Sequence, residues 1–144
     1  MELVIVESPF AGGENIRFEE YTLGRLEMLD GFVGDKKFEF PHNSKTYAKR
    51  QIAIKYARAA MRDCLLRGEA PYASHLLYTQ DGVLDDDTPD ERGLGIEAGL
   101  CWGAAASKTV VYIDLGISDG MAEGIQRAKR EGSPIEQRML PGWS

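Results

Sequence analysis

The residues best suited to chemistry lie where an apolar run, VVYIDLG, passes into a short polar turn and a helix, ISDGMAEGI. A strand that ends in a small, glycine-containing turn places backbone N–H groups and a helix N-terminus at the carboxyl edge of a sheet, where phosphates and sugars commonly bind. Ser118, Asp119, Gly120 and Met121 occupy this junction. Ser118 is also a preferred N-cap, a role that is compatible with ligand binding. We therefore predict a site for a nucleotide-sized ligand.

A second loop is expected beside this turn. Residues 3–7 form a β-branched run that ends in SPFAGG, which predicts a buried strand followed by a flexible, glycine-containing loop. The loops that follow parallel strands meet at one edge of the sheet. We expect Ser8, Phe10, Gly12 and Gly13 to contact the substrate.

Two further polar residues are candidates for the same edge. His75 lies in the middle of a predicted strand, where its ring could hydrogen-bond a sugar or base and titrate near neutral pH, or be a satisfied core histidine. Arg92 stands near a predicted helix start, where its guanidinium could bind a phosphate or pair with an aspartate of residues 85–87. Its neighbour Glu91 has a structural role in a predicted capping box that begins at Thr88.

Glu97 lies on the same predicted helix, between Leu94 and Cys101 at helical spacings, so its carboxylate starts from an apolar stripe. Burying a charge there is costly unless the charge is paired or its pKa shifts. Two interpretations stay open. Glu97 is an ion-paired or surface glutamate, or it is a general acid/base or nucleophile directed at the site.

Alternating strands and helices must position these residues. The pattern predicts strands at residues 3–7, 72–78, 108–115 and 135–140, and helices at 44–67, 89 to about 106, and 118–130. Residues 15–43 fit no regular pattern and suggest an inserted hairpin or mobile flap. Strand–helix units joined by short loops predict one α/β domain over residues 1–144. We expect a three-layer Rossmann-like (flavodoxin-like) fold with a parallel sheet of four or five strands.

The composition excludes several function classes. The 144 residues include 17 basic and 23 acidic ones, and a net charge of −6 argues against the broad phosphate contact of a nucleic-acid-binding protein. Cys64 and Cys101 lack a CxxC or Cys/His pattern and are expected to be reduced core thiols. Residues 85–87 are expected to be a solvated acidic loop, so we predict no metal and no cofactor. Neither a signal peptide nor a membrane span is recognisable, which favours the cytoplasm and no membrane contact.

The chain also resembles a known superfamily. In order, VIVESPFAGG, a long helix, RGEAPYASHLL, PDERGLGIEAG and VVYIDLGISDGMAEGIQRAKREGSPIE resemble the nucleoside 2-deoxyribosyltransferase-like superfamily. More closely, they look like an uncharacterised branch of it found in phage and bacterial genomes. The resemblance covers most of the chain apart from residues 15–43. Its most specific parts are SHLL, the Glu91-Arg92 pair, and SDGM followed by IQRA.

This resemblance implies cleavage or exchange of the N-glycosidic bond of deoxynucleosides or nucleoside 5′-monophosphates. In the characterised relatives a glutamate on the helix after the third strand attacks C1′, and the N-terminus of that helix binds the 5′ end of the sugar. Ser118 matches the position that holds the 5′ end, and Gly12 and Gly13 match the glycine loop. The position of the nucleophile is Gly124 here, immediately after Glu123. Adjacent helical residues point about 100° apart, so Glu123 would need a shifted register or a bent helix to replace it.

Two functions follow from the resemblance. One is an N-glycosidase or nucleoside deoxyribosyltransferase, acting through a covalent glycosyl intermediate or direct attack by water, with Glu123 or Glu97 as its carboxylate. The other is a catalytically lapsed nucleotide-binding module, such as a phage-encoded sensor or sequestering protein, which Gly124 favours. The resemblance also implies a homo-oligomer. Trp143, Phe32, Phe38 and Phe40 are candidates for its contacts, and the alternative is that these aromatic residues cover the domain's own core.

Overall fold

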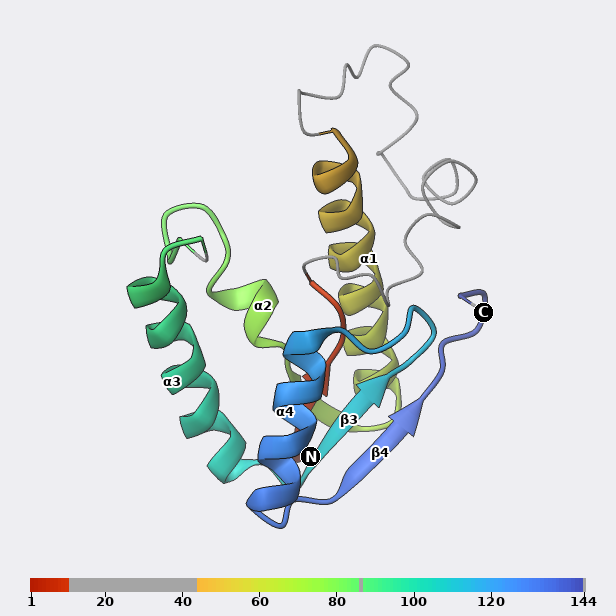
Figure 1. The fold of residues 1–144 in the computed structure, drawn as a ribbon. Helices are drawn as coiled ribbons and strands as arrows, with labels where there is room; N and C mark the ends of the chain where they lie inside the picture. Colours follow the sequence, from red (N-terminus) through yellow and green to blue (C-terminus); the bar gives the residue numbers. More distant parts are fainter. Residues whose placement is uncertain (11–43, 86, 144) are drawn as a thin grey trace.

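The computed structural model describes residues 1–10, 44–85 and 87–143, with the backbone alone for residues 44–48. These parts of the chain form four strands and four helices, whose arrangement can be followed in Figure 1. In chain order they are β1 (Glu2–Glu7), α1 (Ser44–Leu66), β2 (Glu69–Tyr72), α2 (Ser74–Leu77), α3 (Pro89–Ala105), β3 (Lys108–Tyr112), α4 (Asp119–Arg130) and β4 (Ile135–Arg138). No helix within these residues is both long enough and apolar enough to cross a membrane.

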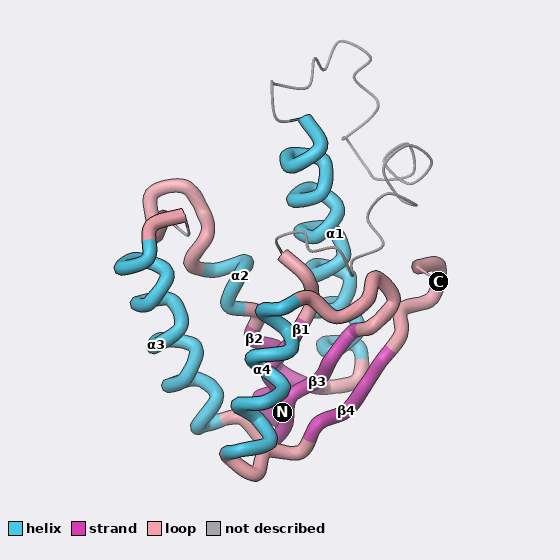
Figure 2. Tube along the Cα trace, viewed as in Figure 1, coloured by secondary structure: helices cyan, strands magenta, loops and turns pink. Residues whose placement is uncertain are grey.

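The four strands form one parallel sheet in the order β2-β1-β3-β4. Helix α1 covers one face, and α4 lies over β3 and β4 on the other, with α3 beside it (Figure 2). The predicted three-layer α/β fold with a four-stranded parallel sheet is therefore confirmed. The connection from β1 to β2 and the connection from β2 to β3 run in opposite directions across the sheet, so the crevice between the carboxyl ends of β1 and β3 is a topological switch point.

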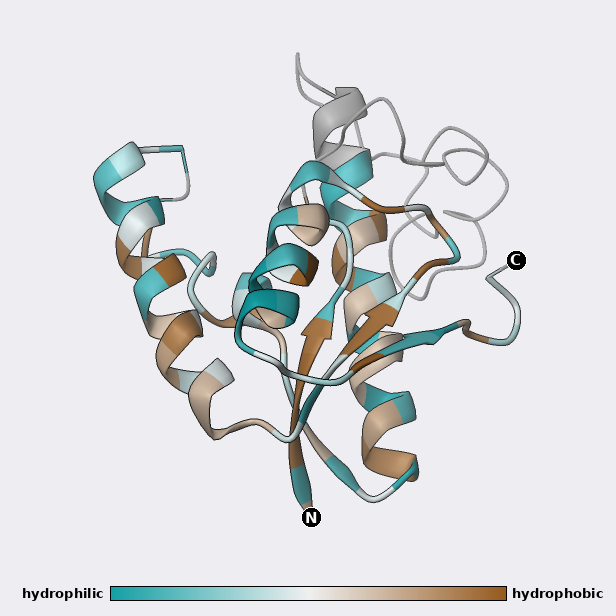
Figure 3. Ribbon diagram, turned by 60° about the horizontal axis from the view of Figure 1, so that its bottom comes forward, coloured by the Kyte–Doolittle hydropathy of each residue, from teal (hydrophilic) through white to brown (hydrophobic). Residues whose placement is uncertain are grey.

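The core lies between the sheet and α1. Residues of β1 alternate between buried and less buried positions, whereas the last four residues of β3 are all buried. Figure 3 shows these strands as a hydrophobic centre. Small residues of α1 let its backbone approach the sheet closely. The buried side chains of α1 in this core are Ile52, Ala53, Tyr56, Ala60 and Cys64.

Helix α4 begins and ends as predicted. The backbone N–H of Met121 donates a 3.2 Å hydrogen bond to Ser118 Oγ, so Ser118 is the N-cap. Met121 and Ala128 are buried, as expected of an amphipathic helix on a sheet. Beyond the last turn, Gly132 adopts a φ of +70°, which ends the helix at low steric cost.

The second strand differs from its prediction. Residues 72–78 were expected to be extended, but β2 ends at Tyr72 and SHLL forms the short helix α2. Periodicity alone does not distinguish a short strand from one helical turn in so brief an apolar run. The strand instead begins at Glu69 and includes Pro71, which is tolerated because β2 is an edge strand. His75 therefore follows the strand instead of lying within it.

Helix α3 has the predicted bounds but not the predicted packing. None of its 17 residues is buried against the described part of the chain. Cys101, which was expected in the core, is exposed, and so are Leu94, Leu100 and Trp102. The helix is rich in glycine, so it offers few side chains for packing on the domain. At its start, Thr88 Oγ1 donates to a carboxylate oxygen of Glu91 and does not cap a backbone N–H, so the predicted capping box does not form.

A network of charged residues joins the outer strands on the α1 side of the sheet. Arg138 at the end of β4 donates two hydrogen bonds, of 2.7 and 2.8 Å, to the Glu69 carboxylate. These bonds lower the pKa of Glu69 to about 2. Lys108 pairs with the same carboxylate at 2.9 Å. This cluster links β2, β3 and β4 and has a structural role.

Candidate functional site

A cavity of about 310 Å³ opens at the switch point, between the end of β1, α2, α3 and the N-terminal half of α4. Its volume falls at the lower end of the range of about 300–1,000 Å³ that is typical of small-molecule sites. Most of the predicted site residues line it. They are Ser8, Phe10, His75, Arg92, Ser118, Asp119, Gly120, Met121 and Glu123.

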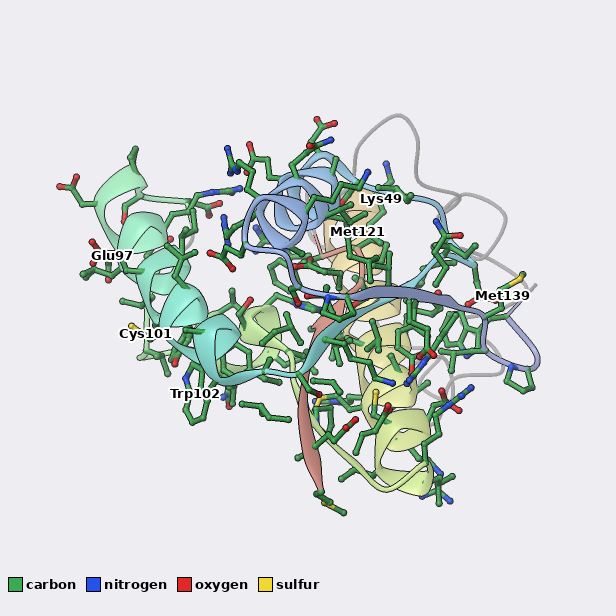
Figure 4. The ribbon with its side chains drawn as sticks, turned by 90° about the horizontal axis from the view of Figure 1, so that it is seen from below. Lys49, Glu97, Cys101, Trp102, Met121 and Met139 are labelled. Carbon is green, nitrogen blue, oxygen red and sulfur yellow. The ribbon has the colours of Figure 1, made fainter. Side chains whose placement is uncertain are left out.

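Three predicted residues are not part of this wall. Gly12 and Gly13 lie outside the described residues. Glu97 is exposed and does not line the cavity. Figure 4 shows Glu97 on the side of α3 that faces away from α4. The interpretation of Glu97 as a surface glutamate therefore fits the structure, and its interpretation as the reacting carboxylate does not.

Ser8, His75 and Phe10 form one wall of the cavity. The Oγ of Ser8 and Nε2 of His75 share a 2.9 Å hydrogen bond, and the Phe10 and His75 rings are 5.7 Å apart. Burial lowers the pKa of His75 to about 4, so the ring is neutral at pH 7. This corrects the expectation that His75 titrates near neutral pH. Its neutral ring is a hydrogen-bonding group that holds Ser8 at the end of β1.

The N-terminus of α4 forms the opposite wall. Because Ser118 Oγ already accepts the Met121 N–H, the cap and the cavity-lining role coexist in the same residue. A Cβ at Gly120 would lie 4.0 Å from Ser118 Oγ, its nearest neighbour. The backbone at Gly120 is therefore open to a ligand that approaches closely.

Two arginines on different helices add positive charge to a largely acidic cavity. Arg92 enters from α3 and Arg127 from α4. Of the aspartates that were weighed as partners for Arg92, Asp87 pairs with Arg50 at 3.5 Å. Within the described residues, no group of three or more histidine, cysteine or acidic side chains is arranged to hold a metal ion.

Glu7, the last residue of β1, is a cavity residue that the sequence analysis missed. Burial raises the pKa of Glu7 to about 7, and the positive charge of Arg127 opposes this rise. Its carboxylate lies against the backbone of α4 at Gly124. A Cβ built there would be 2.2 Å from Glu7 Oε1 and 2.6 Å from its Cδ. The available signal was an acidic residue directly after the apolar run of residues 3–6.

Comparison of the chain with known protein families finds a match. The model of one protein family, described as a domain of unknown function (DUF7768), matches residues 43–138, about two thirds of the chain. The chain belongs to the DUF7768 family. No curated protein and no solved structure matches it.

The DUF7768 match includes three of the four elements that surround the cavity. Helices α2, α3 and α4 lie within residues 43–138, together with β2, β3 and β4. Strand β1 precedes the matched range, so Glu7, Ser8 and Phe10 join the cavity from outside it. The family description assigns no activity, so the function has to be argued from the cavity.

Proposed function

We propose that this protein cleaves or exchanges the N-glycosidic bond of a nucleoside or nucleotide held in the cavity at the carboxyl edge of the sheet. The observation that carries this proposal is that the N-terminus of α4 and the partly buried carboxyl group of Glu7 line one nucleoside-sized cavity. The resemblance to the nucleoside 2-deoxyribosyltransferase-like superfamily supports the same reaction. In this proposal the reaction takes place in the cytoplasm.

The sugar end of the substrate is assigned to the N-terminus of α4. Backbone N–H groups at a helix N-terminus favour an oxygen-rich or anionic ligand, and Gly120 leaves the backbone accessible there. Phe10 and His75 are assigned to the base, because an aromatic face and a neutral ring nitrogen suit stacking and hydrogen bonding. Arg92 is assigned to a phosphate or another acidic group of the substrate.

The reaction requires a carboxyl group near C1′ of the sugar, either as nucleophile or as base for an attacking water. Of the four carboxyl groups that line the cavity, that of Glu91 accepts a hydrogen bond from Thr88 and that of Asp119 lies in the first turn of α4, which leaves Glu7 and Glu123 as candidates. Glu123 is exposed on α4, whereas Glu7 is partly buried at the end of β1. Glu97 does not enter the proposal because it does not line the cavity.

The proposal is tested by incubating the purified protein with the four common deoxynucleosides and their 5′-monophosphates. We expect chromatography to show a free base released from at least one of them. A matched Gly120→Leu variant fills the open space at the α4 N-terminus and is expected to lose at least about tenfold in substrate affinity. If the wild-type protein releases base from no member of the panel, the result would contradict an enzymatic function.

Gly124 favours a second function, a nucleotide-binding module without catalysis, such as a phage-encoded sensor or sequestering protein. The same panel separates the two functions. Titration calorimetry that shows tight binding of a panel member, without any release of base, would favour the module.

We also propose a homo-oligomer, in keeping with the resemblance. The exposed apolar residues of α3, including Leu94 and Leu100, are the described surface best suited to such contacts. Trp143 is not part of it, because its ring packs on Tyr56 of the protein's own core at 5.0 Å. Phe32, Phe38 and Phe40 lie outside the described residues. Light scattering on the purified protein tests this proposal.

A further inference from the structure

Building on the proposed function, we infer that Glu7, at the end of β1, is the catalytic carboxylate that attacks C1′ of the sugar. Gly124 on α4 supplies the space that this carboxylate occupies. The reacting group therefore comes from the strand side of the cavity, and α4 opposite it has no side chain at position 124.

The contact between Glu7 and Gly124 is the first support. A Cβ at residue 124 would approach all three terminal atoms of the Glu7 side chain, at 2.2, 2.6 and 3.0 Å. Any residue other than glycine would therefore displace the carboxylate. The backbone at Gly124 does not have a positive φ, so space and not backbone conformation explains the glycine. Glycine is less favourable than alanine inside a helix, and at Gly124 the close approach of the Glu7 carboxylate accounts for it.

The position of Glu7 in the fold is the second support. It ends a strand at the centre of the sheet, where the switch point brings catalytic groups and ligands together. The next two residues, Ser8 and Pro9, are buried, and Ser8 is held by His75. The backbone that carries Glu7 is therefore fixed on both sides. A reacting group needs such fixed positioning.

Glu123 lacks these properties. It is exposed on α4 and directly precedes Gly124, the residue that faces Glu7. Glu123 is adjacent to Gly124 in the sequence, but its side chain cannot occupy the space beside Gly124, because adjacent helical residues point about 100° apart. Within the cavity, the carboxyl group that is both partly buried and directed at the α4 backbone is that of Glu7.

The reaction has two steps. In the first, an oxygen of the ionised Glu7 carboxylate bonds to C1′ while the C1′–N bond breaks; the base leaves with the electron pair of that bond and takes a proton from water. In the second, a water oxygen bonds to C1′ while the bond to Glu7 breaks, and a proton passes to solvent. The products are the free base, the free sugar and the original carboxylate. An incoming base in place of water would complete a transfer.

The first test removes the charge and keeps the shape of the side chain. Glu7→Gln is expected to lower kcat for base release by at least about 100-fold, because the neutral amide cannot replace the carboxylate as the nucleophile that bonds to C1′. Glu131→Gln, at the exposed C-cap of α4 and outside the cavity, is the matched control and is expected to retain at least a third of the wild-type rate. Circular dichroism and calorimetric binding of the best panel substrate check that Glu7→Gln folds and binds.

The second test uses the space at Gly124. Gly124→Ala is expected to lower kcat at least tenfold by pushing the Glu7 carboxylate aside, whereas Gly103→Ala, whose Cβ would meet nothing within 4 Å, retains the wild-type rate. In the double variant Glu7→Ala with Gly124→Glu, the carboxylate enters the same space from the helix. This variant is expected to be at least tenfold faster than Glu7→Ala alone.

The third test locates the intermediate. Acid quenching during turnover, followed by tryptic digestion and mass spectrometry, is expected to find the sugar on the N-terminal peptide that contains Glu7. An adduct on the peptide that contains Glu123, or full activity of folded Glu7→Gln, would overturn this inference while leaving the proposed function intact. A wild-type protein without any base release would overturn both.

Discussion

The two helices that face each other across the cavity, α4 and α3, are built in opposite ways. Helix α4 buries Met121 and Ala128 on the sheet, begins at a hydrogen-bonded serine cap and has basic residues in its last turn. Helix α3 buries none of its residues against the described chain and exposes several large apolar side chains. Both helices contribute residues to the same cavity. One wall is therefore packed on the core, and the other is not.

This difference suggests that α4 positions the substrate and that α3 adjusts to it. A helix packed on the sheet keeps its N-terminus in a fixed place relative to the ends of β1 and β3, which suits the sugar and the reacting bond. A helix with few buried contacts opens at a lower free energy than the core and can adjust to a ligand or a partner. The predictions below test the contrast, from the largest expected effect to the smallest.

Truncation of one apolar side chain on each helix gives the largest contrast. Met121→Ala is expected to lower the free energy of unfolding by about 2–5 kcal/mol, because it removes a fully buried side chain. Leu100→Ala is expected to lower it by less than about 1 kcal/mol, because Leu100 is exposed on α3. Urea denaturation measures both.

Equal losses for the two variants would show that α3 is packed as firmly as α4. Repeating the Leu100→Ala measurement at two protein concentrations sharpens the contrast. A loss that grows with concentration would show that α3 packs on a second copy of the chain.

The Glu7 carboxylate gives the next largest effect, through pH. Its folded-state pKa is raised from 4.5 to about 7, so the folded protein holds this proton more tightly than the unfolded chain does. The resulting stabilisation is complete below pH 4.5 and is lost as the pH rises through 7, by about 3 kcal/mol. Glu7→Gln removes this loss. The difference in stability between wild type and variant should therefore change by that amount between pH 4 and pH 8.

The comparison at equal pH is needed because His75 has the opposite effect. Its lowered pKa stabilises the folded state above pH 6.5 and ceases to do so as the pH falls to about 4. The titratable and charged residues that share the cavity with Glu7 are His75 on α2, Glu91 and Arg92 on α3, and Asp119, Glu123 and Arg127 on α4, and of these Arg127 acts on the pKa of Glu7. Glu2→Gln, at the exposed start of the same strand, is the control. A pH profile that is identical in wild type and Glu7→Gln would contradict the burial of this carboxylate.

Two glycines give the smallest contrast. Gly103→Ala on α3 is expected to stabilise the protein by up to about 1 kcal/mol, because its Cβ would meet nothing within 4 Å and alanine favours the helix. Gly124→Ala on α4 is expected to gain nothing, because its Cβ would collide with Glu7. Thermal unfolding compares the two. A similar gain at both positions would mean that the Glu7 side chain moves away freely.

Most of the fold could be predicted because its signals are local and strong. The long periodic pattern of α1, the serine cap and amphipathic face of α4, and the β-branched run of β1 all formed the expected elements. The short run SHLL was placed in a strand because periodicity does not separate one helical turn from a strand over four residues. The apolar stripe of α3 was expected to be buried because periodicity indicates an apolar face but not the partner that covers it.

The site followed the same division. Residues at the strand ends and the α4 N-terminus were predicted, because parallel topology brings those ends together. Glu97 was weighed as a reacting group on its place in an apolar stripe, and the exposure of that stripe removed the argument. Glu7 was missed because its local signal, an acidic residue after an apolar run, is equally typical of an ordinary strand end.

Local residue order was sufficient for the identity of all the elements except α2, for their approximate bounds and for the edge of the sheet where a ligand would bind. These properties depend on periodicity, capping and chain connectivity, which act between near neighbours. The pairing of Glu7 with Gly124 and the bare surface of α3 emerged only when the strands and helices were assembled. Both depend on the space between segments distant in the sequence, and that space is set by packing.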